Sequence, residues 1–299
     1  MKKEGSLLTG LITVVAVLAV LSLGISGIMR GCSNKATAPS PTPATSYPDP
    51  LILGYDHPNA VQTADGYYLT ATDTAGNAVL FFADTAAGLA TAKPKTLEGV
   101  TGAVTLYRIN SDWLLLGADG AQYTCAGDDP YADAWSQTKP GEAGVTTCAI
   151  VETGADERLL VTCGASGVTL TKLEGLEITD QSALIAQPKA QPVISVSSIV
   201  NDKWVSIIYV AGEGGERAAY MVGLDDPANW DDADNWVIFS MRVFASDAGL
   251  SGMSFVKDGE NGLFIYDQSN ADGQPIIRAQ QYTVSTTGLP VFGLPKALN

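Results

Sequence analysis

Short apolar runs alternate with polar turns along the chain from about residue 51 onward. In the clearest example an apolar run reaches Asp65-Gly66, and the alternating strand Tyr67 to Thr72 follows this two-residue turn. An Asp-Gly pair between two such runs is typical of a tight β-hairpin. Five hairpins of this kind are predicted, and their second strands begin near residues 67, 113, 158, 204 and 262. The spacing is therefore 46, 45, 46 and then 58 residues.

A period of roughly 40 to 50 residues, with several short strands in each unit, is typical of a β-propeller. The pattern also predicts a third strand after each hairpin, at Val79 to Ala83, Gln122 to Ala126, Val168 to Leu173, Ala218 to Leu224 and Ile276 to Thr283. We therefore predict an all-β fold, a five-bladed β-propeller over residues 51–299. A two-sheet sandwich also uses many short strands, but it does not explain the even spacing.

Residues 1–31 are predicted to be a membrane anchor or a signal. The run Leu7 to Ile28 is apolar apart from Gly, Ser and Thr, and at about 1.5 Å per residue it is long enough to cross a bilayer. We favour a single uncleaved transmembrane helix, and Lys2 and Lys3 narrowly favour a cytoplasmic N-terminus. The alternative is a lipoprotein signal that ends at Cys32, although Met29-Arg30-Gly31 departs from the usual lipobox. Both interpretations place the propeller outside the cytoplasm, tethered at a bacterial cell surface.

Residues 32–50 are predicted to be a disordered linker, because Ser, Thr, Ala and Pro dominate and no apolar period is present. The chain has 32 acidic and 17 basic residues and a net charge of −15, without a basic cluster beyond the anchor. A phosphate backbone needs a positive protein face, so we expect no nucleic-acid partner. Surface acid that keeps an exported domain soluble is the simplest explanation of the charge.

The cysteines and the acidic loop do not indicate a cofactor or a metal. Cys148 and Cys163 lie symmetrically about the third hairpin turn, and the sequence leaves open whether they form a disulfide or remain buried thiols. Their spacing is not that of a zinc site. The acidic loop from Asp225 to Trp236 lacks the glycine and the terminal glutamate of a calcium-binding loop.

The two ends of the predicted propeller resemble a known family. The first stretch runs from Asp49-Pro50 through Asp56-His57-Pro58 to Tyr67-Tyr68-Leu69, and the last is Gly288-Leu-Pro-Val-Phe-Gly-Leu-Pro295. Both are similar to the opening and the closing segments of glycoside hydrolase family 43. The resemblance covers the whole predicted extracellular domain, and it implies a five-bladed propeller and substrates that contain arabinose or xylose.

The same resemblance implies three carboxylates near the starts of innermost strands: a general base, a general acid and a group that tunes the acid. At the matching positions this chain has His57 for the base, Thr147 for the tuning group and Ser195 for the acid. In the last blade, where many members have a histidine, the matching residues are Gly252 and Met253. We therefore assign no catalytic residue and expect a degenerate active site.

Four residues are candidates for ligand binding: Asp56, His57, Trp135 and Trp230. His57 is the single histidine of the chain, and it either contacts a ligand or is a structural residue before proline. Asp56 can replace the missing base only if a β-bulge turns its side chain inward, because adjacent strand residues point to opposite faces. Trp135 and Trp230 lie in predicted loops, where an indole ring can act as a platform for a sugar.

Three hypotheses about function follow. The first is a membrane-tethered, glycosidase-like propeller that has lost catalysis and binds a glycan or a protein of the cell envelope. The second is an active hydrolase of arabinose- or xylose-containing glycans that uses other acids, such as Asp56, Glu152 or Glu213. The third is a structural scaffold propeller of the envelope with no ligand at its centre.

Overall fold

The middle strands of the sheets are buried on both faces. Strand β15 (Val205–Ala211) reads Val-Ser-Ile-Ile-Tyr-Val-Ala, and all seven residues are buried. Strand β3 (Gly66–Asp73) is buried at every position but the last. Because the sheets of a propeller cover one another on both sides, a middle strand needs no polar face.

The computed structural model describes residues 47–153, 157–175, 177–201, 204–239, 242–246, 249–258 and 261–293. The predicted anchor at 1–31 and most of the predicted linker at 32–50 lie outside these ranges, and so does most of the turn predicted at 154–157. Within the described ranges, no helix is long and apolar enough to cross a membrane.

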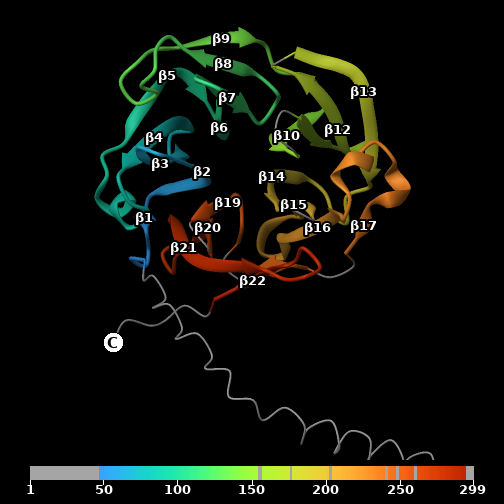
Figure 1. Ribbon diagram of the computed structural model, residues 1–299. Helices are drawn as coiled ribbons and strands as arrows, with labels where there is room; N and C mark the ends of the chain where they lie inside the picture. The colour runs from blue at the N-terminus through green and yellow to red at the C-terminus, as the bar shows by residue number, and fades with distance from the viewer. Residues whose placement is uncertain are drawn as a thin grey trace, which may run out of the picture. The chain divides into compact units, whose positions relative to one another are not determined.

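The described strands form five antiparallel sheets, and Figure 1 shows them arranged around a centre, with β2, β6, β10, β14 and β19 nearest to it. Blade 1 contains β2 (Tyr55–Thr63), β3, β4 (Asn77–Ala83) and β5 (Lys95–Thr101). Blade 2 contains β6 (Val104–Ile109), β7 (Asp112–Gly117), β8 (Gln122–Cys125) and β9 (Trp135–Lys139). Blade 3 contains β10 (Val145–Glu152), β11 (Arg158–Gly164), β12 (Gly167–Glu174) and β13 (Glu177–Ala186).

Blade 4 contains β14 (Val193–Val200), β15, β16 (Ala218–Leu224) and β17 (Val237–Ile238), and β18 (Phe244–Ala245) also pairs with β16. Blade 5 contains β19 (Met253–Asp258), β20 (Asn261–Ser269), β21 (Pro275–Val284) and β1 (Ile52–Leu53), and β22 (Pro290–Phe292) also pairs with β21. The described connections include the short 3-10 helices η1 (Ala87–Thr91), η2 (Gly214–Glu216), η3 (Pro227–Asn229) and η4 (Ala233–Asn235).

This architecture confirms the predicted five-bladed propeller. The second strands of the five hairpins begin at residues 66, 112, 158, 205 and 261, each within one residue of its predicted start. Strand β1 was not predicted from the sequence; it pairs with β21 and so adds an N-terminal strand to the last blade.

The apolar core is divided among the seams between blades. In the described part of the chain each of the five seams has its own cluster of buried side chains. Alternation along β15 shows how this arises, because Ile207 and Tyr209 pack against blade 3 while Ile208 and Val210 pack against blade 5. Full burial of one such side chain contributes about 1.5–3 kcal/mol, so each seam is held mainly by apolar contact.

The seam between blades 5 and 1 also has a buried carboxylate. Asp267 is at the end of β20 and is 1% exposed. Its Oδ2 accepts a hydrogen bond from the backbone N–H of His57 at 2.7 Å. Its Oδ1 accepts from the backbone N–H groups of Ser251 at 2.6 Å and Gly252 at 2.9 Å. One side chain therefore ties the start of blade 1 to the segment that leads into blade 5.

We expect Asp267→Ala to lower the free energy of unfolding by about 3 kcal/mol, because three N–H groups in the seam lose their acceptor. Chemical denaturation of the purified protein measures this difference. Asp272→Ala removes an exposed carboxylate from the turn after β20 and is the matched control. Equal effects of the two substitutions would contradict this role for Asp267.

Candidate functional site

The start of β2 contains a β-bulge. Asp56 is paired with Thr72, and the next paired residue, Asn59, is opposite Thr70, so the pair His57-Pro58 faces a single residue of β3. His57 has φ of 49°, in the left-handed region that non-glycine residues rarely adopt. A bulge of this kind changes the direction of side chains along one strand. Here it separates the two neighbours, because the His57 and Asp56 side chains line different cavities.

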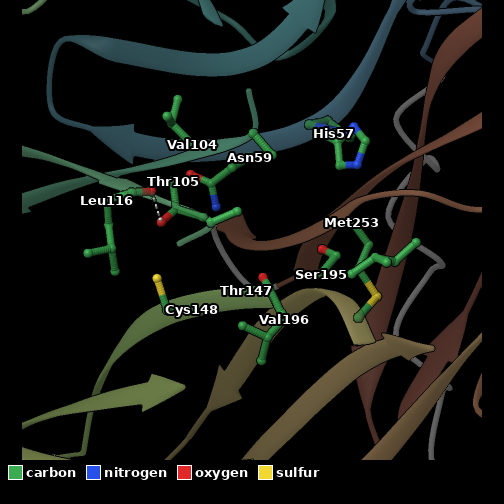
Figure 2. Close-up of a pocket in the computed structure, with 14 residues that line it drawn as sticks. His57, Asn59, Val104, Thr105, Leu116, Thr147, Cys148, Ser195, Val196 and Met253 are labelled. Carbon is green, nitrogen blue, oxygen red and sulfur yellow. Dashed lines mark hydrogen bonds between the residues drawn. The ribbon is translucent and has the colours of Figure 1, made fainter. Parts of the chain in front are cut away.

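His57 lines a pocket at the centre of the propeller, which we call the axial pocket. Each of the five innermost strands contributes to it, with His57 from β2, Thr105 from β6, Thr147 from β10, Ser195 from β14 and Met253 from β19. Figure 2 shows these side chains around one space. The structure therefore brings together His57, Thr147 and Ser195, the three positions that the family resemblance matched to carboxylates.

The axial pocket is narrow and its lining is uncharged apart from His57. Its volume is about 20 Å³, which is room for about one water molecule. Among the described residues that line it, none carries a carboxylate. Cys148 also lines it, but burial raises the pKa of this thiol to about 12, and its Sγ donates a hydrogen bond to the Gly117 carbonyl at 3.0 Å. Cys148 is thus a neutral thiol and not a nucleophile.

His57 is poised to carry a positive charge. Burial lowers its pKa, and this is the largest single effect. The hydrogen bond between Nδ1 of His57 and Oδ1 of Asp56, at 2.9 Å, acts in the opposite direction, as do the charges of Asp56 and Asp267. The positive charge of Arg217 lowers the pKa slightly. The raising effects dominate, so the pKa of His57 is above its ordinary value of 6.5.

Asp267 is the second group near the bulge whose pKa is shifted. Burial raises its pKa, while the N–H donors of Gly252, Ser251 and His57 and the charge of His57 lower it in part. The net pKa is above the ordinary value of 3.8. Asp267 was not a candidate from the sequence, although an acid at the end of the apolar run Leu263-Phe-Ile-Tyr-Asp267 is a recognisable signal.

Asp56 lines a larger cavity of about 540 Å³, which we call the seam cleft. Its lining comes from blades 1, 4 and 5 and the segments between their strands: Asp56, Gly214, Gly215, Arg217, Gly249, Ser251, Asp267, Gln268, Ser269, Gly273 and Pro275. The bulge that Asp56 requires is present, but Asp56 is not among the residues that line the axial pocket. Arg217 was not a candidate from the sequence either, because a lone arginine after a glycine-rich loop belongs to no motif.

The other sequence candidates are not among the residues that line either cavity. Trp230 is 2% exposed in the core between blades 3 and 4, so the prediction that it forms a sugar platform is wrong. Trp135 begins β9, the outermost strand of blade 2, and its Nε1 donates to the Pro130 carbonyl at 3.1 Å. Glu152 is at the far end of β10 and pairs with Nε of Arg158 at 3.0 Å. Glu213 is exposed at the start of η2.

The two central cysteines of blade 3 are free thiols. Register places Cys148 opposite Thr162 and Cys163 opposite Thr147. The two side chains therefore point to opposite faces of the sheet, with Cys148 in the cluster between blades 2 and 3 and Cys163 in the cluster between blades 3 and 4. The disulfide alternative is not formed, because a hairpin bridge requires side chains on one face.

No described group of three His, Cys, Asp or Glu side chains is arranged to hold a metal ion. In the acidic loop, the Asp226 side chain accepts from the N–H of Ala228 and that of Asp232 accepts from the N–H of Asp234. These carboxylates cap the 3-10 helices η3 and η4.

We expect Gly252→Ala to distort the bulge. A Cβ atom at residue 252 would lie 2.5 Å from Cα of His57 and 3.0 Å from Cδ of Pro58, and neither atom belongs to a flexible side chain. Overpacking of this kind costs about 1–3 kcal/mol, which denaturation measures. Gly293→Ala, whose new Cβ atom would have only ordinary contacts, is the control. Unchanged stability and an unshifted His57 NMR signal in Gly252→Ala would contradict this contact.

We also expect the imidazole of His57 to titrate above pH 6.5. As the chain has one histidine, a single NMR resonance reports its pKa. The folded-state pKa exceeds the unfolded one, so the stability contributed by protonated His57 is fully present below pH 6.5 and is lost as pH rises through the folded-state pKa. Asp56→Asn should lower the pKa, and Asp65→Asn, at the other end of β2, should leave it unchanged. A resonance that titrates below 6.5 in the unsubstituted protein would contradict the assignment.

No family model matches the chain, and no similar protein was found among curated proteins. Solved structures do match. An α-L-arabinofuranosidase from Lactobacillus brevis has a TM-score of 0.70 and 20% identity, and the match covers 85% of this chain and 98% of that one. A thermostable family-43 glycoside hydrolase has a TM-score of 0.65 and 13% identity, with 85% and 98% covered. An exo-1,5-α-L-arabinanase from a bovine ruminal metagenomic library has a TM-score of 0.59 and 12% identity, with 84% and 100% covered. The chain is thus structurally similar to the five-bladed propellers of glycoside hydrolase family 43.

Proposed function

We propose that this protein is a surface-tethered relative of the family-43 propellers that binds a glycan and does not hydrolyse it. The observation that carries the proposal is the lining of the axial pocket, where His57, Thr147 and Ser195 occupy the positions matched to the three carboxylates. Inverting hydrolysis requires two carboxyl groups roughly 6.5–9.5 Å apart, with space for a water molecule and a sugar between them. A pocket of about 20 Å³ with neutral hydroxyl groups meets neither requirement.

The glycan part of the proposal is supported by the fold. The three similar structures described above are glycosidases by name, and the names of two of them specify arabinose-containing substrates. The chain has a large polar cavity beside the axis, in the size range of pockets that hold small ligands. The tether is proposed from the sequence alone, on the length of the apolar run Leu7 to Ile28.

A scaffold for another envelope protein is the second candidate. It is favoured by the apolar side chains of Val104, Leu116, Ile194, Val196 and Met253, which share the narrow axial pocket with the polar ones. A propeller with a filled centre is able to hold its fold without any ligand there. In that case the outer surface, and not the axis, carries the function.

The test is an assay of the full-length protein, in mild detergent, on aryl α-L-arabinofuranosides and aryl β-D-xylosides. We expect no turnover above a buffer blank, together with measurable binding of the matching oligosaccharides by calorimetry. Because glycosidases accelerate hydrolysis by many orders of magnitude, an active hydrolase run in parallel sets the sensitivity.

Turnover that exceeds the blank and disappears in Asp56→Asn would contradict the proposal and favour an active hydrolase with a replacement acid. Absence of both turnover and binding would favour the scaffold.

A further inference from the structure

The seam cleft contains two opposite charges that are not paired with each other. Arg217 and Asp56 both line it, yet within the described residues they form no ion pair with each other or with any other side chain, except that Asp56 contacts His57. Structural ion pairs elsewhere in the chain are direct, as between Arg158 and Glu152 at 3.0 Å. The two cleft charges are therefore available to a ligand.

Arg217 has more donors than the protein satisfies. Its Nη1 donates to Oγ of Ser251 at 3.0 Å. Its Nε is buried without a hydrogen-bond partner. A guanidinium group carries five N–H donors in a fixed plane, and here one contact to a serine hydroxyl sets the orientation of that plane. The terminal nitrogen that Ser251 does not contact makes no hydrogen bond to a described residue, so it remains as a donor for a ligand.

Asp56 supplies the complementary acceptor. One carboxylate oxygen, Oδ1, contacts the His57 ring, and the side chain is 34% exposed. Its second oxygen makes no hydrogen bond to any described residue, so it is able to accept from a ligand. The contact to His57 fixes the rotation of the carboxylate, because a neighbour on the same bulge holds one end of it.

Most of the other residues that line the seam cleft have polar side chains or are glycines. Ser251 and Gln268 add a hydroxyl and an amide, and the rim includes Gly214, Gly249 and Gly273. A Cβ atom at any of these three glycines would meet nothing within 4 Å, and all three have positive φ. The turns therefore require glycine, and the rim stays open as a result.

These groups match the chemistry of a neutral sugar. A hydroxyl group donates and accepts at once, so the hydroxyl groups of a sugar are able to accept from Arg217 and donate to Asp56. The cleft has no excess positive charge, because Asp56 and Asp267 offset Arg217, and the chain carries a net charge of −15. An acidic sugar is thus disfavoured relative to a neutral one.

We propose that the seam cleft, and not the axial pocket, is the sugar-binding site, and that it takes a neutral sugar unit through Asp56 and Arg217. This inference rests on the proposed glycan-binding function. Among the described lining residues there is no aromatic ring, so recognition depends on hydrogen bonds to the two charged groups.

The experiment is calorimetric titration of the full-length protein with neutral arabino- and xylo-oligosaccharides, using Asp56→Asn and Arg217→Gln. Asp65→Asn and Arg108→Gln are matched controls, because that pair, 3.9 Å apart, lies at the opposite end of β2. We expect each cleft substitution to weaken binding at least tenfold, and each control to change it less than twofold. Thermal unfolding of every variant is recorded, and Arg217→Lys is used if Arg217→Gln fails to fold.

A second readout is the His57 imidazole resonance, which should shift when sugar is added because Asp56 contacts the ring. Binding that survives both cleft substitutions, with an unmoved resonance, would overturn the seam-cleft site and leave the glycan function standing. Tighter binding of uronic-acid oligosaccharides than of neutral ones would overturn the ligand class. No binding of any oligosaccharide would overturn this site and the proposed function together.

Discussion

Closure of the ring is the constraint on which the rest of the structure depends. Four seams join blades that follow one another in the chain, but the fifth must bring distant residues into contact, such as His57 and Asp267, which are 210 positions apart. Besides the apolar cluster of this seam, two polar interactions help to close it: β1 pairs with β21, and the buried carboxylate of Asp267 accepts three backbone N–H groups from both sides. The strand pairing sets the register of the seam. The carboxylate holds the backbone of Ser251 and Gly252 on one side of the seam and the backbone of His57 on the other.

The same seam determines the geometry of both cavities. Asp267 binds the backbone of His57, which is held at φ of 49°, and Gly252 lies against that residue with no space for a side chain. The bulge therefore directs His57 to the axis and Asp56 to the cleft. The closeness of Gly252 to the bulge also accounts for its lack of a side chain, at a position where the resembling family often has histidine.

The two cavities differ in chemistry as well as in size. At the axis, small hydroxyl groups and apolar side chains surround a space of about 20 Å³, and Cys148 is a neutral thiol. At the seam, a carboxylate and a guanidinium group share a cavity of about 540 Å³. His57 connects them, because its ring faces the axis while its Nδ1 contacts the acid of the cleft. The charge on this one histidine therefore influences the electrostatic potential in the seam cleft, through its contact with Asp56.

The number of blades and the course of their strands could be read from the sequence, because hairpin turns and apolar runs are local signals that repeat with the fold. Asp65-Gly66 and its counterparts placed the second strand of each hairpin within one residue. The convergence of His57, Thr147 and Ser195 followed from the family resemblance, since a closed ring brings equivalent strand starts to one axis.

Only the tertiary structure decided three other features: the burial of Trp230, the opposite orientations of Cys148 and Cys163, and the use of β1 in the last blade. The presence of Asp56 and Arg217 in the lining of one cavity was decided there too. Each depends on which residues from distant segments meet at a seam, and neither spacing nor composition along a chain encodes that contact.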